Sequence, residues 1–249
     1  MKRKILIDVG NTNTSIAFAE GKTLKHKCFI RTAKKEIDPS SLKRLLGRWL
    51  PVSDEIVAVQ VVPDFFRALS KSLAQAAPDL PVRVIGKDIK VPMKIRYKDP
   101  SQVGQDRLVT SYGGVEAYGF PLIMIDFGTA VTFDYVGDEG VYEGGLIFPG
   151  LRIALEALSS KAALLPKIEL HPARELVGRD TQSSITSGVL YGFAGACDGI
   201  VEKLKRESAS TTKVIATGGD ASLVARYAGS IDKVHKDIIF EALISLSGE

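Results

Sequence analysis

The sequence is poor in cysteine, in tryptophan and in long apolar runs. Of its 249 residues two are cysteine, Cys28 and Cys197, and one is tryptophan. The cysteines lie far apart and no Cys-x-x-Cys occurs, which argues against a disulfide framework and a zinc site and indicates a reducing cytoplasm. The longest uncharged stretch, 181–197, is full of Ser, Thr and Gly. No segment therefore supplies the roughly 20 apolar residues of a membrane span.

An excess of one charge sign is also missing. The chain has 33 basic and 29 acidic side chains, a net charge of +4, and no basic run longer than that at 2–4. This balance does not favour nucleic-acid binding. Asp8 interrupts the first apolar run, so no signal peptide is predicted. Hydrophobic residues make up 45% and charged residues 25% of the chain, which is typical of a globular protein with one large or two small domains.

Short apolar runs alternate with turn signals and with leucines at helical spacing, a pattern that indicates an α/β protein. The first half predicts three strands followed by helix, strand, helix and strand. These strands are expected at 5–7, 15–19, 23–30, 56–62 and 82–85, with helices beginning at Pro39 and Pro63. In the second half, strands are expected at 122–125, 131–136, 141–147, 213–216 and 231–234, and helices at 150–159, 180–205 and 221–227.

The two halves also match in their residues. The letters ILIDVG at 5–10 align with IMIDFG at 123–128, and Thr14 matches Thr132 at the same offset of 118 residues. An internal repeat of this kind predicts two domains of like fold. We place them at 1–117 and 118–249 and expect a glycine turn from each domain to face a shared cleft.

Each copy of the repeat ends in a candidate phosphate-binding hairpin. A strand that ends in Asp-x-Gly and continues with small polar residues predicts a tight turn whose N–H groups and hydroxyls can bind phosphate. Asp8 would act through a metal or a water, since a carboxylate repels phosphate. The first copy alone is better explained as an ordinary Asn/Gly-rich hairpin turn. Two copies at matching positions favour a bound polyphosphate, although no P-loop pattern occurs.

Two further segments carry side chains or turns suited to chemistry. In Gly104-Gln105-Asp106-Arg107, an acid beside a cation is usually a surface ion pair or a helix-start charge. As function, Asp106 could accept a hydroxyl proton while Arg107 holds an anion. The double glycine in 216–220 predicts either a tight strand–helix connection or a turn on which a nucleoside lies.

Glycines recur along one face of the long predicted helix. Because each costs up to about 1 kcal/mol inside a helix, the stripe indicates close approach by another helix. That helix can belong to the same chain or to a second subunit, and the pattern does not distinguish them. The stripe consists of Gly188, Gly192, Gly195 and Gly199.

Taken together, the motifs resemble the type III pantothenate kinases of the acetate kinase, sugar kinase, Hsp70 and actin superfamily. The resemblance spans nearly the whole chain and rests on ILIDVGNTNT, VGQDR, MIDFGTAVTFD, EGGLIFPGLRIALEAL, VGRDTQSSITSG and VIATGG, in family order. It implies an α/β fold of two duplicated ribonuclease H-like domains with mixed sheets on either side of a nucleotide cleft. The family often has Ala at position 105 and Asn at position 180.

The resemblance also implies roles for individual residues. Asp106 would be the catalytic proton acceptor, and Asp126 would hold the monovalent cation, K⁺ or NH₄⁺. The expected ATP-binding residues are Asp8, Val9, Gly10, Asn11, Thr12, Asn13, Thr14, Ser15 and Thr129. The expected pantothenate-binding residues are Tyr97, Gly104, Gln105, Asp106, Arg107 and Thr181, the last of them across a homodimer interface.

The implied activity is phosphorylation of pantothenate by ATP with Mg²⁺, the first step of coenzyme A biosynthesis. Phosphoryl transfer between two anions depends on positioning and on electrostatic stabilisation. The rival class is a non-catalytic accessory or regulatory relative of the same fold, and the presence of Asp106, Arg107 and Asp126 argues against it. Another small-molecule kinase of the superfamily is a second rival, which the short chain and VGQDR disfavour.

Overall fold

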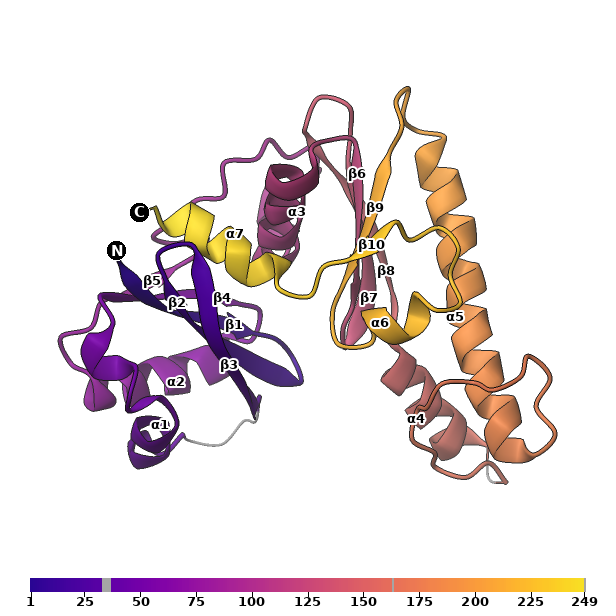
Figure 1. Cartoon of the computed structure of the whole chain (residues 1–249), viewed down its shortest axis with the longest axis horizontal. Helices are drawn as coiled ribbons and strands as arrows, with labels where there is room; N and C mark the ends of the chain where they lie inside the picture. Colours follow the sequence, from indigo (N-terminus) through magenta and orange to yellow (C-terminus); the bar gives the residue numbers. More distant parts are fainter. Residues whose placement is uncertain (33–36, 163, 249) are drawn as a thin grey trace. The chain divides into compact units, whose positions relative to one another are not determined.

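The structure is a computed structural model that describes residues 1–32, 37–162 and 164–248. Contacts between Cα atoms divide the chain into two compact units. The first unit comprises Met1–Pro92, Ser101–Gly113 and Asp237–Glu249, and the second comprises Met93–Pro100 and Gly114–Lys236. Each unit is built on one five-stranded mixed sheet (Figure 1), as the duplicated α/β fold predicts.

The sheet of the first unit has the strand order β3-β2-β1-β4-β5. The strands β1, β2 and β3 form an antiparallel meander, and β4 and β5 run parallel to β1. The elements are β1 (Arg3–Val9), β2 (Asn13–Glu20), β3 (Thr23–Arg31), α1 (Pro39–Leu46), β4 (Glu55–Gln60), α2 (Pro63–Ala76), β5 (Val82–Val84), the start of α3 (Gln105–Tyr118) and α7 (Ile238–Ser247).

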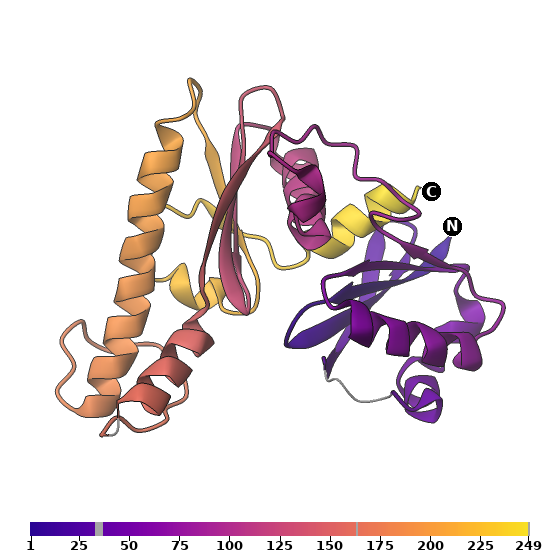
Figure 2. The same ribbon diagram turned by 180° about the vertical axis from the view of Figure 1, so that it is seen from behind.

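Both faces of this sheet are covered, because successive side chains of a strand point to opposite sides. Ile5 and Ile7 of β1 pack with Leu69 of α2 on one face, and α1 adds Leu42 and Leu46 there. On the other face, Leu6 packs with Val109 of α3 and with Phe240 and Leu243 of α7. Figures 1 and 2 show α1 and α2 on the side of the sheet opposite to α7.

The sheet of the second unit has the matching order β10-β9-β6-β7-β8. In this sheet β6, β7 and β8 form the antiparallel meander, and β9 and β10 run parallel to β6. The elements are β6 (Leu122–Phe127), β7 (Ala130–Val136), β8 (Tyr142–Pro149), α4 (Leu151–Lys161), α5 (Thr181–Lys205), β9 (Lys213–Thr217), α6 (Ala221–Val224) and β10 (Lys233–Val234).

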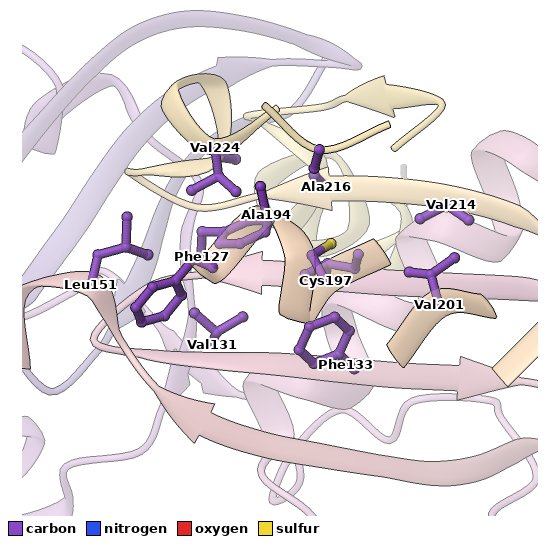
Figure 3. Packing of buried hydrophobic residues seen from close by; sticks show 14 of the residues in the cluster. Phe127, Val131, Phe133, Leu151, Ala194, Cys197, Val201, Val214, Ala216 and Val224 are labelled. Atoms are coloured by element: carbon purple, nitrogen blue, oxygen red, sulfur yellow. The ribbon is translucent and has the colours of Figure 1, made fainter. Parts of the chain in front are cut away.

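The long helix α5 covers one face of the second sheet. Ala194, Cys197 and Val201 of α5 pack against Phe127 and Phe133 of the strands (Figure 3). Burial raises the pKa of the Cys197 thiol to about 11, so this side chain is a packing residue and not a nucleophile. Among the helices that the structure describes, none combines the length and the apolar composition needed to cross a membrane.

Three details differ from the sequence expectations. The strand expected at 231–234 is only Lys233–Val234, and the helix expected at 221–227 ends at Val224. The C-terminal helix α7 was missed, because its sequence IIFEALISLS is apolar nearly all round and lacks an amphipathic pattern.

The compact units also group the chain differently from a division at 117/118. The segment Met93–Pro100 belongs with the second unit and α7 with the first, because Phe240 and Leu243 pack on Leu6. As a boundary between the two copies of the repeat, 117/118 stays a prediction.

A buried ionic network fastens the end of α7 to the first sheet. Lys4, which is 1% exposed, donates from Nζ to Ser247 Oγ at 2.7 Å and to the carbonyl of Gly248. Its Nζ also lies 3.5 Å from Glu55 Oε1. Arg83 completes the network by contacting Glu55 Oε2 and the carbonyl of Ser247, both at 3.2 Å. Burial lowers the pKa of Lys4, and Glu55 opposes that effect.

We expect Lys4→Met to destabilise the protein by about 3 kcal/mol, because it removes the buried ammonium that contacts Glu55 and the end of α7 and leaves only Arg83 to contact both. Urea denaturation measures the change. The matched control is Lys2→Met, since Lys2 is exposed and its replacement should stay within about 0.5 kcal/mol of wild type. Equal denaturation midpoints for the two variants would show that the network does not hold α7.

Candidate active site

The first glycine hairpin joins β1 to β2 and presents polar groups at its tip. Gly10 N donates to Asn13 O at 3.1 Å, which closes a tight turn in which Asn11, Thr12 and Asn13 are exposed. A Cβ at Gly10 would lie 3.1 Å from Asn13 O. The predicted residues Val9 and Thr14 are each 0% exposed. They support the hairpin, and its tip is the part available to a ligand.

Thr32 braces this hairpin, a role that the sequence did not indicate. Its N–H donates to Thr12 O at 2.9 Å, its Oγ1 donates to Gly10 O at 2.7 Å, and the same Oγ1 lies 3.0 Å from Thr14 Oγ1. Thr32 follows β3 directly, and Asn13 pairs with Arg31 in the sheet. A predicted register of β2 against β3, with Asn13 opposite Arg31, would have placed Thr32 beside the hairpin.

The segment Gly104–Arg107 forms the start of α3. The carboxylate of Asp106 accepts a 2.8 Å hydrogen bond from Arg107 N and lies against Gly104, where a Cβ would be only 2.5 Å from Asp106 Oδ1. Glycine at 104 therefore makes room for the carboxylate. The amide of Gln105 lies in the same way over Gly86, whose φ is +85° and whose Cβ would be 2.8 Å from Gln105 Oε1.

The environment of Asp106 favours its protonated form. Burial raises the pKa of this carboxyl above its ordinary value, while the hydrogen bond from Arg107 N and the Arg107 charge pull the pKa the other way. Desolvation is the larger effect. A carboxylate whose pKa is raised is a better proton acceptor than an exposed one.

The hairpin and the start of α3 lie at one edge of the first sheet. The hairpin follows β1, and Val61, directly after β4, donates from N to Val9 O at 3.1 Å. Gly86, which contacts Gln105, comes shortly after β5. The parallel strands β1, β4 and β5 are neighbours in that order, and their carboxyl ends form the edge at which open α/β sheets bind ligands.

Two other glycines enclose the second hairpin, which joins β6 to β7. A Cβ at Gly150 would lie 2.1 Å from Thr129 O, and a Cβ at Gly218 would lie 2.3 Å from Asp126 Oδ1. Gly218 also has φ of +94°, which a residue with a side chain rarely adopts. The segments before α4 and α6 therefore approach the hairpin as closely as the main chain allows.

The turn 216–220 is thus a tight connection that lies on the second hairpin. Asp220 N donates to Phe127 O at 3.2 Å, and Asp220, which is 8% exposed, accepts a 3.2 Å hydrogen bond from Arg152 Nη2. This geometry explains Gly218 without a ligand, whereas a Cβ at Gly219 would meet nothing within 4 Å, and a nucleoside contact at this turn stays a prediction.

Thr181 is exposed and is the first residue of α5. Asp180 caps the helix, because its carboxylate accepts from Ser183 N at 2.8 Å and the Ser183 hydroxyl in turn accepts from Asp180 N. The bonds from Ser183 lower the pKa of Asp180. The carboxylate where the family often has Asn is therefore engaged in helix capping.

The glycine stripe of α5 has no partner helix in the part of the chain that the structure describes. A Cβ at Gly188, Gly192, Gly195 or Gly199 would meet no atom within 4 Å. Gly188 and Gly192 instead line an open pocket of about 380 Å³ together with Phe148 and Leu158. Phe148 is 37% exposed and Leu158 is 38% exposed, so within the described chain this face of the second unit is apolar and uncovered.

The predicted site residues thus fall into two groups. The hairpin Asp8–Ser15 and Gly104–Arg107 belong to the first unit, and Tyr97, Asp126, Thr129 and Thr181 to the second. Asp126 and Thr129 share the second hairpin, whereas Tyr97 lies on the segment beside β8 and Thr181 at the start of α5. No group of three or more His, Cys, Asp or Glu side chains among the described residues has the arrangement of a metal site.

The sequence matches a known family over most of its length. The family model for type III pantothenate kinase matches residues 4–203. The chain is 39% identical over 235 residues to the type III pantothenate kinase of Geobacillus sp. (strain WCH70), covering 92% of this chain and 91% of that one. It is 38% identical over 245 residues to that of Syntrophotalea carbinolica, covering 96% of each chain.

Solved structures share the fold at low sequence identity. A candidate Baf family transcriptional activator from Campylobacter jejuni matches with a TM-score of 0.60 at 17% identity, covering 97% of this chain and 96% of that one. Component A of (R)-2-hydroxyglutaryl-CoA dehydratase from Acidaminococcus fermentans matches with a TM-score of 0.55 at 12% identity, covering 99% and 96%. These likenesses concern the fold, and the assignment follows from the family match and the two relatives: the chain belongs to the type III pantothenate kinase family.

Proposed function

We propose that this protein transfers the γ-phosphoryl group of ATP to pantothenate and forms 4′-phosphopantothenate, the first step of coenzyme A biosynthesis. The observation that carries the proposal is the match to type III pantothenate kinases over 92–96% of the chain. The half-buried carboxylate of Asp106 at the start of α3 supports it. A non-catalytic accessory role is not favoured, because the chain has Asp106, Arg107 and Asp126.

In this reaction Asp106 is the proton acceptor. The primary hydroxyl oxygen of pantothenate forms a bond to the γ-phosphorus, the bond from that phosphorus to the β–γ bridging oxygen breaks, and ADP leaves. Asp106 takes the hydroxyl proton as the new bond forms. Its burial and its contact with Gly104 hold the carboxylate in one place, and Arg107 supplies a positive charge beside it for the anionic substrate.

The two hairpins are the proposed nucleotide contacts. The exposed tip of Asp8–Ser15 offers N–H groups and hydroxyls to the ATP phosphates, and Thr129 of the second hairpin contacts ATP. Asp8, near the end of β1, would act through Mg²⁺, which is usually held by one or two carboxylates and the substrate phosphates. The ion would neutralise charge on the phosphates.

Asp126 is the proposed holder of the monovalent cation. Its Oδ1 lies where a Cβ at residue 218 would be 2.3 Å away, so the glycine leaves a cradle beside the carboxylate. A carboxylate oxygen in such a cradle fits a cation. Bound there, K⁺ or NH₄⁺ would offset negative charge close to the phosphates.

A homodimer is the proposed assembly. The uncovered stripe of α5 and the exposed side chains Phe148 and Leu158 form an apolar face of the kind that marks protein interfaces. Thr181 begins the same helix. In a dimer through this face, Thr181 would contact pantothenate bound to the neighbouring chain.

We place the enzyme and its small-molecule substrates in the cytoplasm.

We expect Asp106→Asn to lower kcat by at least about 100-fold with little change in ATP affinity, because the variant keeps the shape and loses the proton acceptor. A coupled ADP-release assay with pantothenate measures turnover, and nucleotide titration measures affinity. Full turnover would remove Asp106 from the role of base.

The same variant has its own folding control. Because burial raises the pKa of Asp106, its charged form destabilises the folded state at pH values above the ordinary carboxyl pKa. Asp106→Asn should therefore be at least as stable as wild type at neutral pH. The difference should shrink toward about pH 4, where protonation removes the penalty. Thermal melts at both pH values would reveal lost activity that came from unfolding.

The cation proposal predicts that activity is lost in buffer with Na⁺ alone and returns with K⁺ or NH₄⁺ at the same ionic strength. Asp126→Ala should abolish this activation, because it removes the proposed ligand. Initial rates against K⁺ concentration test both statements. An Asp126→Ala enzyme that responds to K⁺ as wild type does would contradict the assignment.

The dimer proposal predicts that Gly192→Leu yields a monomer that does not phosphorylate pantothenate. Within the described chain a Cβ at 192 meets nothing within 4 Å, so the substitution should leave the fold intact. Light scattering measures the mass. Lys205→Leu, an exposed change in the last turn of α5, is the control and should stay dimeric. A wild-type monomer at micromolar concentration would refute the proposal.

A further inference from the structure

The segment Met93–Pro100, here called the 93–100 segment, contains Tyr97 and belongs to the second unit. It lies beside β8, which is the edge strand of the second sheet. One bridge joins them: Tyr142 N donates to Lys94 O, and Arg96 N donates to Tyr142 O, both at 2.8 Å. The segment therefore extends the sheet by a single bridge just before Tyr97.

Side chains on both partners strengthen this short attachment. Arg96 Nη1 lies 3.1 Å from Glu143 Oε1, and Glu139 Oε2 is more distant, at 4.0 Å from Arg96 Nη2. Glu143 is the better placed of the two acids, since its side chain is 23% exposed and that of Glu139 is 80% exposed. Its carboxylate also lies over Gly137, where a Cβ would be 3.1 Å from Glu143 Oε1.

Tyr97 itself lies against Gly144. A Cβ at 144 would be 3.4 Å from Tyr97 Cε2 and 3.5 Å from Tyr97 Cδ2, so the ring covers the side of Gly144 from which a side chain would project. Gly144 has φ of +122°, next to the register shift between Tyr135 and Val136. Tyr97 is still 37% exposed, which leaves part of the side chain available to a ligand.

The point of attachment is rigid because Tyr142 is anchored in the sheet. Its side chain is 0% exposed, and its hydroxyl donates to Asp134 Oδ1 at 2.6 Å. Asp134, 2% exposed, also accepts from Thr132 Oγ1 at 3.1 Å. Three consecutive residues of β8 thus hold the segment in different ways: Tyr142 through the main chain, Glu143 through an ion pair and Gly144 through the ring.

We propose that the Arg96–Glu143 ion pair is a positioning device that sets Tyr97 for binding the acceptor substrate. The inference rests on the proposed function, in which Tyr97 lines the pantothenate site. Neither Arg96 nor Glu143 needs to touch the substrate. Their pairing fixes the main chain at residue 96 and, through it, the direction in which the Tyr97 side chain leaves the segment.

The test is the KM for pantothenate in two variants of opposite charge change, Arg96→Met and Glu143→Gln. Positioning predicts that both raise this KM about two- to five-fold, the size expected for a partly exposed ion pair, with kcat and the KM for ATP nearly unchanged. A purely electrostatic effect on an anionic substrate predicts opposite shifts, since one variant removes a positive charge and the other a negative one.

Matched controls and a double-mutant cycle separate the two causes. Lys98→Met and Glu139→Gln make the same charge changes nearby and should leave the KM within about twofold of wild type. In a Tyr97→Ala background, Glu143→Gln should have no further effect on this KM, because the effects of mutations at coupled residues do not add.

A charge swap tests the pair directly. Restored affinity for pantothenate in the double variant Arg96→Glu with Glu143→Arg would also support the pair. Thermal melts verify folding.

The outcomes distinguish this inference from the proposed function. A wild-type enzyme that does not phosphorylate pantothenate overturns both. If wild type is active and Tyr97→Ala raises the KM, the inference alone is overturned by opposite shifts in the two charge variants, by unchanged KM values, or by an additive effect of Glu143→Gln in the Tyr97→Ala background. An unchanged KM in Tyr97→Ala overturns the role of Tyr97 and with it the positioning.

Discussion

Close approach of main chain to carboxylates and carbonyls, which only glycine permits, is the constraint on which the candidate site depends. A Cβ at Gly104, Gly150 or Gly218 would lie 2.1–2.5 Å from Asp106, Thr129 or Asp126, distances that no side chain can occupy. In the first unit Gly104 lies against the half-buried Asp106 carboxylate, and in the second Gly150 and Gly218 enclose the β6–β7 hairpin. Because these glycines have no Cβ, they let the Asp106 and Asp126 carboxylates and the Thr129 carbonyl lie directly against the main chain.

Burial has a different result at each ionisable group, depending on what compensates it. At Lys4 a buried cation meets Glu55, Ser247 and Gly248, so the network holds α7 on the first sheet. At Asp106 desolvation outweighs the neighbouring Arg107 charge, and the pKa of the carboxyl rises. A protein fold tolerates such an uncompensated charge mainly where function uses it. The two groups lie in the same unit, one serving stability and the other the proposed chemistry.

Family membership and geometry contribute different parts of the functional argument. The match over residues 4–203 and the relatives at 38–39% identity identify the chemistry, since fold alone does not imply function. The structure adds supporting roles that the motifs did not indicate, namely those of Thr32 behind the first hairpin and of Tyr142, Glu143 and Gly144 beneath the 93–100 segment. These residues lie opposite their partners through strand pairing, so their roles depend on strand register and bulges.

The local pattern of the sequence was sufficient for nearly all strands and helices and for the duplication, because alternation, leucine spacing and glycine turns are short-range signals. The repeat at 5–10 and 123–128 placed both hairpins correctly at the ends of β1 and β6. Only the tertiary structure decided that α7 returns to the first sheet and that Thr14 is buried behind its hairpin. Each of these depends on which distant segment lies alongside, and packing between residues far apart in the chain leaves no periodic trace in the sequence.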